Sequence, residues 1–142
     1  MFTPFYKPFH SAKPKRAYIS GPMTGYENNN FEAFDEAAAA LRKMGYSVCS
    51  PSETDRWLGE MTHEEYMRFD FERVLEADFV VALDGWEQSL GALSEILMAV
   101  RMGVKVWRWP TFASYDLVTY DDVVKAISDL HFSVEDDWGF RV

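Results

Sequence analysis

The sequence is poor in cysteine, in basic residues and in long hydrophobic runs, and each shortage excludes a class of protein. Its 142 residues include one cysteine, Cys49, which excludes an intramolecular disulfide framework and a multi-cysteine metal site. With 14 basic against 23 acidic residues, the formal charge of −9 argues against nucleic acid and anionic membranes as partners. No run approaches the roughly 20 apolar residues of a membrane span, and no signal-peptide core is present. We therefore expect an acidic, cytoplasmic protein that binds neither nucleic acid nor membrane.

Motifs that hold metals and phosphate-containing cofactors are also missing. The sequence contains neither the GxxxxGK[ST] phosphate loop nor the GxGxxG dinucleotide fingerprint. The three histidines, His10, His63 and His131, do not have the spacing of metal ligands. We therefore expect no metal ion and no organic cofactor.

The composition that is present suits one globular domain with two short extensions. Hydrophobic residues make up 48% of the chain, which is ample for a packed core. Residues 16–132 have regular patterns and predict one α/β domain, and residues 133–142 form an acidic, aromatic tail. Residues 1–15 hold three of the six prolines and predict an irregular arm. The arm carries aromatic side chains that could pack onto the domain or onto a second subunit, namely Phe2, Phe5 and Phe9.

Predicted strands and helices alternate along the domain. Short apolar runs predict strands at residues 17–20, 46–49, 79–83 and 104–109. Apolar residues at helical spacing predict helices at about 31–44, 63–77, 91–102 and 121–130. Residues 52–61 are polar and are interpreted as a loop. The alternation predicts a three-layer α/β sandwich with a mostly parallel, flavodoxin- or Rossmann-like sheet of about five strands.

Polar residues after the first and third predicted strands mark the candidate site, because ligands of open α/β sheets bind at the carboxyl ends of strands. These residues are Ser20, Gly21 and Met23 after the first strand, and Asp84, Trp86 and Ser89 after the third. We expect the two loops to lie side by side if their strands are neighbours. Trp86 could stack on a base. Ser89 with Gly91 could bind a phosphate or a sugar hydroxyl at a helix start, or Ser89 could simply cap that helix.

Two carboxylates on predicted helices could perform chemistry. Glu95 lies one turn into its helix, as a functional group or as a solvated residue that offsets the helix dipole. Asp70 shares the apolar side of its helix, and partial burial would raise its pKa toward that of a general acid. Alternatively, Asp70 is bonded to Arg73 or Arg68. Two carboxylates in one cleft would suit cleavage at an acetal-like carbon.

Three motifs occur in a fixed order along the chain. A strand that reads Tyr-x-x-Gly at residues 18–21 opens the domain. Asp70 lies eight residues before the aspartate of an Ala-Asp pair that leads into an apolar strand. Ser89-Leu90-Gly91 follows, with Glu95 six residues after the serine. Between about Ala17 and Val106 the sequence therefore resembles the nucleoside 2-deoxyribosyltransferase-like family. The resemblance includes its 2′-deoxynucleoside 5′-phosphate N-hydrolase branch and a phage- and bacteria-associated branch with a YISGPMTG-type opening.

The resemblance implies a homo-oligomeric enzyme, a dimer or higher, that acts on a small-molecule nucleoside or nucleotide without a metal or cofactor. It implies that Glu95 attacks the anomeric carbon of the deoxyribose. Asp70 would protonate or orient the leaving base, and Tyr18 would hold Glu95. The product would be a free base, with the deoxyribosyl group passed to another base or to water.

The same resemblance implies that Ser89 and Gly91 lie at the sugar 5′ end and that Asp84 contacts a sugar hydroxyl or the base. The first loop, residues 22–25, departs from the nucleotide-hydrolysing branch because it lacks the Ser and Arg used around phosphate. Neither loop has a basic residue, so nucleoside and 5′-monophosphate both stay open as substrates. The alternative is a non-catalytic nucleoside- or nucleotide-binding or sensing module with the same pocket.

Overall fold

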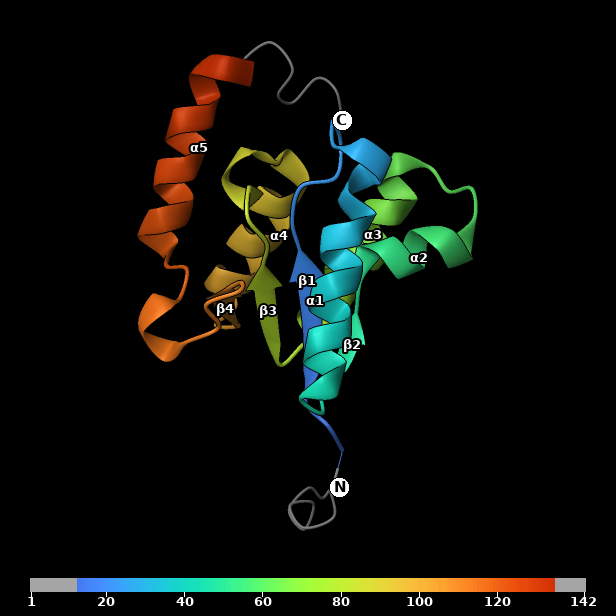
Figure 1. The fold of residues 1–142 in the computed structure, drawn as a ribbon. Coiled ribbons are helices and arrows are strands. Elements are labelled where there is room, and N and C mark those ends of the chain that lie inside the picture. Colours follow the sequence, from blue (N-terminus) through green and yellow to red (C-terminus); the bar gives the residue numbers. More distant parts are fainter. Residues whose placement is uncertain (1–12, 135–142) are drawn as a thin grey trace, which may run out of the picture.

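The structure, a computed structural model, describes residues 13–134 (Figure 1). Most of the predicted arm and tail, residues 1–12 and 135–142, lies outside the described residues. The described part is an α/β sandwich with strands β1 (Arg16–Ser20), β2 (Ser47–Cys49), β3 (Phe79–Ala82) and β4 (Lys105–Arg108). All neighbouring strands are parallel, in the order β2-β1-β3-β4, which is the beginning of a flavodoxin-like sheet. The predicted parallel α/β class is confirmed.

The described sheet has four strands, so the predicted number of about five is wrong. After β4 the chain passes through Pro110, which has no N–H to donate to a strand ladder. Leu117 returns to the sheet edge and forms a single antiparallel bridge with Trp107. Val118 adds one backbone hydrogen bond to Val106, 2.9 Å long. The segment therefore touches β4 without forming a fifth strand.

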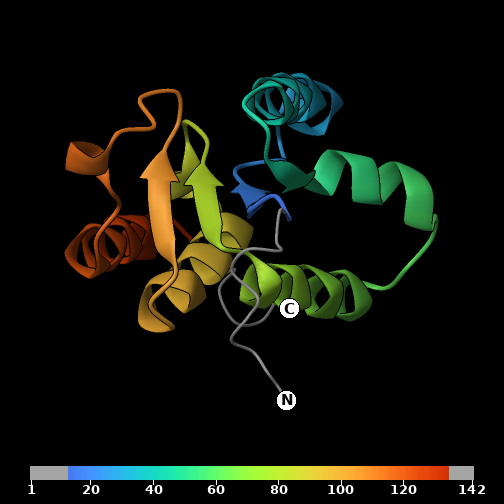
Figure 2. The same ribbon diagram turned by 90° about the horizontal axis from the view of Figure 1, so that it is seen from below.

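Helices cover both faces of the sheet (Figure 2). They are α1 (Phe31–Lys43), α2 (Pro51–Leu58), α3 (His63–Glu76), α4 (Leu90–Arg101) and α5 (Tyr120–Val134). Helix α1 packs on one face, and α3, α4 and α5 pack on the other. The predicted capping box of α3 is present, because Thr62 Oγ1 accepts from the Glu65 amide and the Glu65 carboxylate accepts from the Thr62 amide.

Helix α2 replaces the loop predicted for residues 52–61. Pro51 occupies the first helical turn, where the missing N–H of proline is not needed, and Ser50 is the N-cap residue. The helix is tied to α1 by a 2.8 Å hydrogen bond from Ser52 Oγ to Asp35 Oδ1. Serine followed by proline is a sequence signal for the start of a helix. The prediction missed this helix because the polar composition of residues 52–61 is also typical of a loop.

The pleat of β1 divides its side chains between two cores. Ala17 and Ile19 are buried against α1, whereas Tyr18 is buried in the cluster with α3, α4 and α5. Because successive strand residues point to opposite faces, Ser20 projects to the same side as Tyr18. The first strand therefore delivers two hydroxyl groups to the face covered by α4.

The loops after β1 and β3 lie side by side, as predicted. The strands pair directly, and the Leu83 amide donates to the Ser20 carbonyl oxygen at 2.9 Å. Gly21 meets Leu83 so closely that a Cβ at position 21 would lie 2.8 Å from the Leu83 Cβ. The absent side chain of Gly21 is thus required for this contact.

Replacing Gly21 by alanine should destabilise the protein by about 1–3 kcal/mol, because overpacking displaces buried neighbours. Urea unfolding measures the loss. Gly91→Ala is the matched control, since a Cβ there meets only the Ser89 Oγ at 4.0 Å. Equal midpoints for the two variants would contradict the steric role of Gly21.

Candidate active site

Glu95 is buried at the centre of the candidate site. It lies on the second turn of α4, is 6% exposed, and accepts two hydrogen bonds from β1. The Tyr18 hydroxyl donates to Oε2 at 3.0 Å, and the Ser20 hydroxyl donates to Oε1 at 2.7 Å. Glu95 is therefore not the solvated residue of the alternative interpretation. Both of its oxygens are held in fixed positions.

Burial strongly affects the protonation of Glu95. Burial, followed by the negative charge of Asp70, raises the pKa of the carboxyl from its ordinary 4.5 to about 8. The hydrogen bonds from Ser20 and Tyr18 oppose this increase, because they favour the ionised form. The pKa of Tyr18 is also raised, by burial and then by the charges of Glu95 and Asp70. The Tyr18 hydroxyl is therefore a neutral donor at physiological pH.

Asp70 is the second carboxyl of the site. It lies on α3, and burial followed by the charge of Asp55 raises its pKa from 3.8 to about 6. The Arg73 guanidinium lowers this pKa, but its hydrogen bonds go to Glu76 and Glu72. Asp70 forms no ion pair with Arg73 or Arg68 in the described structure, so the alternative of an aspartate bonded to either arginine is wrong. Asp70 is a carboxyl whose protonation changes near neutral pH.

Ser89 and Gly91 lie at the start of α4, one turn before Glu95. The Ser89 hydroxyl accepts from the Ala92 amide at 3.1 Å, so Ser89 caps the helix as its alternative interpretation predicts. Gly91 is exposed and leaves the first turn of α4 open. These residues remain candidates for contact with the end of a substrate.

Three other predicted site residues lie toward the α1 side of the sheet. Met23 packs against the α1 cluster, and the missing side chain of Gly21 makes room for Leu83. Asp84 is exposed and lines a cavity of about 660 Å³ with Tyr26. The cavity lining does not include Glu95 or Asp70.

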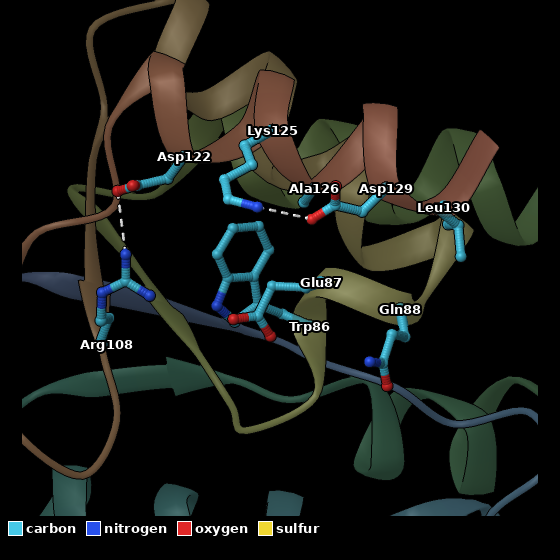
Figure 3. A pocket seen from close by; sticks show the side chains of 9 residues that line it. All are labelled: Trp86, Glu87, Gln88, Arg108, Asp122, Lys125, Ala126, Asp129 and Leu130. Carbon is cyan, nitrogen blue, oxygen red and sulfur yellow. Dashed lines mark hydrogen bonds and ion pairs between the residues drawn. The ribbon is translucent and has the colours of Figure 1, made fainter. Parts of the chain in front are cut away.

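Trp86 is buried in the core, with 3% of its surface exposed. It belongs to the short helix η3 (Trp86–Gln88) and lines a cavity of about 460 Å³ between η3, β4 and α5. Figure 3 shows its indole below the ion pair that Lys125 forms with Asp129. The Arg108 guanidinium lies 5.8 Å from the ring centroid and is paired with Asp122. The ring therefore packs against α5 instead of standing free in a loop.

Sequence reasoning missed Asp55, whose charge raises the pKa of Asp70. Asp55 lies on α2, in the segment that was interpreted as a loop, so its direction could not be placed. The signal that would have found it is the Ser50-Pro51 helix start, since a helix there fixes which residues face α3. The bond from Ser20 to Glu95 was also missed, because Ser20 was assigned to the substrate.

Two groups of findings concern metals and membranes. Within residues 13–134, no set of three or more His, Cys, Asp or Glu side chains is grouped as metal ligands. No helix in this same stretch is long and apolar enough to cross a membrane.

Replacing Glu95 by glutamine should stabilise the protein increasingly as the pH rises. The folded chain keeps a proton on Glu95 up to about pH 8, whereas the unfolded chain releases it near 4.5. Stability from this site is therefore complete below about pH 4.5 and is lost as the pH rises through 8. We expect the melting temperature of the variant, relative to wild type, to increase by at least about 3 °C between pH 5 and pH 8. Glu87→Gln, at an exposed position, is the control, and a difference independent of pH would contradict the burial of a charge.

The fold defines the structural class. A 2-deoxyribosyltransferase from the psychrotolerant bacterium Bacillus psychrosaccharolyticus matches with a TM-score of 0.53 and 23% identity, over 66% of this chain and 70% of that one. A 2-deoxyribosyltransferase from Leishmania mexicana matches with a TM-score of 0.55 and 18% identity, over 67% of this chain and 63% of that one. A conserved protein from Enterococcus faecalis V583 matches with a TM-score of 0.52 and 25% identity, over 67% of this chain and 62% of that one. This chain thus spans less than two thirds of the last two proteins, and it has the 2-deoxyribosyltransferase fold.

The family is defined by sequence. Residues 15–108 match the family model described as Domain of unknown function (DUF4406), and the chain belongs to that family. No functionally curated protein matches the sequence. The matched region contains Tyr18, Ser20, Asp70 and Glu95. The resemblance drawn from three motifs is confirmed at the level of the fold.

Proposed function

We propose that this protein cleaves the N-glycosidic bond of a 2′-deoxynucleoside or its 5′-monophosphate, with Glu95 as nucleophile and Asp70 as general acid. The observation that carries the proposal is the buried Glu95 carboxyl, held by Tyr18 and Ser20 and coupled electrostatically to Asp70. The fold shared with two 2-deoxyribosyltransferases supports the same reaction class. The reaction needs no metal or organic cofactor.

In the first step, a Glu95 oxygen bonds to the anomeric carbon of the deoxyribose. The bond from that carbon to the base nitrogen breaks, and its electron pair leaves with the base. Asp70 donates a proton to the departing base and becomes a carboxylate. The step forms a deoxyribosyl ester of Glu95 and a free, neutral base.

In the second step, water or the ring nitrogen of another base attacks the anomeric carbon. Asp70, now a carboxylate, takes the proton from the attacking group. The ester bond breaks, and Glu95 leaves as a carboxylate. Water as the acceptor gives hydrolysis, and a base gives deoxyribosyl transfer.

The chemistry requires one proton on the pair of carboxyls, placed on Asp70. With pKa values of about 6 for Asp70 and about 8 for Glu95, the pair holds one proton between those limits. In the empty site this order favours the proton on Glu95. Positive charge that develops on the sugar beside Glu95 favours the ionised Glu95, which shifts the proton to Asp70.

The pKa of Glu95 also favours a second function. A carboxyl that is neutral at pH 7 can hold a ligand by hydrogen bonds without attacking it. A nucleoside- or nucleotide-binding module without catalysis would then use the same residues. Such a module returns its ligand unchanged.

Chromatography of released base tests the two functions. Purified protein is incubated with the four deoxynucleosides and their 5′-monophosphates, with and without a second free base. Release without an acceptor identifies a hydrolase, and exchange that requires the acceptor identifies a transferase. If every substrate is recovered intact while one of them binds tightly, the catalytic proposal is wrong and the binding module is supported.

A preference for nucleosides or for 5′-monophosphates depends on which residues contact the 5′ end of the sugar. We propose that the Ser89 hydroxyl, as a donor, and the Gly91 amide contact it, since polar hydrogens at the start of a helix can bind an oxygen or a phosphate. A preference for 5′-monophosphates should then disappear in Ser89→Ala, whereas the rate with nucleosides should stay unchanged.

We also propose that the protein is a homo-oligomer, and light scattering measures its mass in solution directly.

A further inference from the structure

The outer face of α3 carries an apolar groove of about 460 Å³. Met67, Phe71 and Leu75 follow each other at four-residue spacing along it, and Leu75 is 52% exposed. Only residues of α3 line the groove within the described part of the chain. Met67 and Phe71 are half-buried, so each keeps part of its apolar side chain available beside the exposed Leu75. An apolar stripe of this kind can bind a further apolar segment.

The chain enters the domain next to one end of this groove. The Arg16 amide donates to Asp78 Oδ2 at 2.7 Å, and the Asp78 amide donates to the Arg16 carbonyl oxygen at 2.8 Å. Arg16 also lines a small cavity with Arg73 and Glu76 of α3. Leu75 is three residues before Asp78. The segment that precedes Arg16 therefore starts beside the Leu75 end of the groove.

The length of that segment suits the groove. From Leu75 to Met67 the groove extends about 12 Å, at 1.5 Å for each helical residue. From Arg16 back to Phe9 an extended chain spans about 23 Å, and from Phe9 to Phe2 it spans about 23 Å more. Phe9 can therefore reach Leu75, and the residues before it can extend to Met67.

Charge and composition of the segment also fit. Residues 1–15 contain three lysines and no acidic residue, in a chain whose net charge is −9. The charged residues that line the groove are Glu64, Glu72 and Arg68, with His63 at one end, so the carboxylates outnumber the arginine. Phenylalanines recur at positions 2, 5 and 9, and they offer apolar side chains at intervals along the segment.

We propose that residues 2–9 of the same chain bind along the α3 groove, with their phenylalanine side chains on Met67, Phe71 and Leu75. Lys7 lies near Glu72 in this arrangement. The segment then covers the helix that carries Asp70. The proposal does not depend on the reaction proposed above, because it rests on the groove, the chain entry and the charges.

Paramagnetic broadening tests this docking on the full chain. A nitroxide is attached at Thr3→Cys in a Cys49→Ser background, which leaves all three phenylalanines in place. Amide signals from Met67 to Leu75 should lose most of their intensity, whereas those of α1 on the opposite face should keep theirs. Leu75→Glu should restore the α3 signals. Leu58→Glu, at an exposed apolar position on α2, should leave them broadened.

Two results would overturn the proposal. Unbroadened α3 signals, or broadening that survives Leu75→Glu, would mean that the segment does not bind in the groove. A mixture of spin-labelled, isotopically unlabelled protein with isotopically labelled protein lacking the nitroxide separates one chain from two. Broadening of α3 in that mixture would assign the groove to the arm of a second copy, contrary to binding within one chain.

Discussion

Glu95→Ala should lower the rate of deoxynucleoside cleavage by at least about 10⁴-fold, since removal of a nucleophile removes the covalent route altogether. Tyr18 and Ser20 hold one oxygen each of the Glu95 carboxyl by hydrogen bonds, and alanine at this position leaves them no nucleophile to hold. Released base is measured by chromatography under single-turnover conditions. Incubation with substrate followed by mass spectrometry should detect the deoxyribosyl ester in the wild type and not in the variant.

Folding must be separated from chemistry in this test. Glu95→Gln keeps the shape of the side chain and should lose activity to a similar degree while it melts at or above the wild-type temperature. Glu87→Ala, on the exposed turn before α4, should keep full activity. Wild-type rates in either Glu95 variant would remove Glu95 from the mechanism and would require a different nucleophile or direct attack by water.

Asp70→Asn should lower the rate by about 10²–10⁴-fold, the usual contribution of general acid catalysis. The defect should be largest for bases that leave poorly. It should shrink for a deoxyriboside whose leaving group needs no proton, because Asp70 then has little to donate. The comparison of kcat for the two kinds of substrate measures this directly. A defect of the same size for both would assign Asp70 to positioning.

The pH profile gives Asp70→Asn a second signature. In the wild type, kcat/KM should fall below about pH 6, where both carboxyls are protonated, and above about pH 8, where both are ionised. Asparagine has no ionisable proton, so kcat/KM of the variant should no longer fall as the pH rises. Asp121→Asn, at an exposed position of α5, should keep the wild-type profile. A flat wild-type profile between pH 5 and 9 would contradict a shared proton.

Local sequence patterns were sufficient for most of the fold. The helical spacing that ends before Gly45, the Thr62–Glu65 capping box and the apolar run from Phe79 each predicted an element that the structure contains. These signals act within a few residues, so they can be recognised without the rest of the chain. Helix α2 was missed because its polar composition outweighed the proline at its first turn.

The strand count and the role of Trp86 depended on distant contacts. The residues after β4 would add a strand only if they paired with β4 over several residues. The structure contains a single bridge, between Leu117 and Trp107, and the sequence does not reveal how far such pairing extends. Trp86 looked available for stacking because it follows a strand. The packing of α5 over it, from more than 30 residues further along the chain, buries its ring.

The sequence by itself singled out Asp70 and Glu95 as candidates, because helical spacing puts Asp70 on the apolar side of one helix and Glu95 one turn into another. Only the tertiary structure decided their protonation. The pKa of Glu95 is set by its burial between α4 and β1 and by its bonds to Tyr18 and Ser20. The pKa of Asp70 is set by burial and by the charge of Asp55. Desolvation and Coulomb interactions act through space between residues far apart in sequence, so no local pattern encodes them.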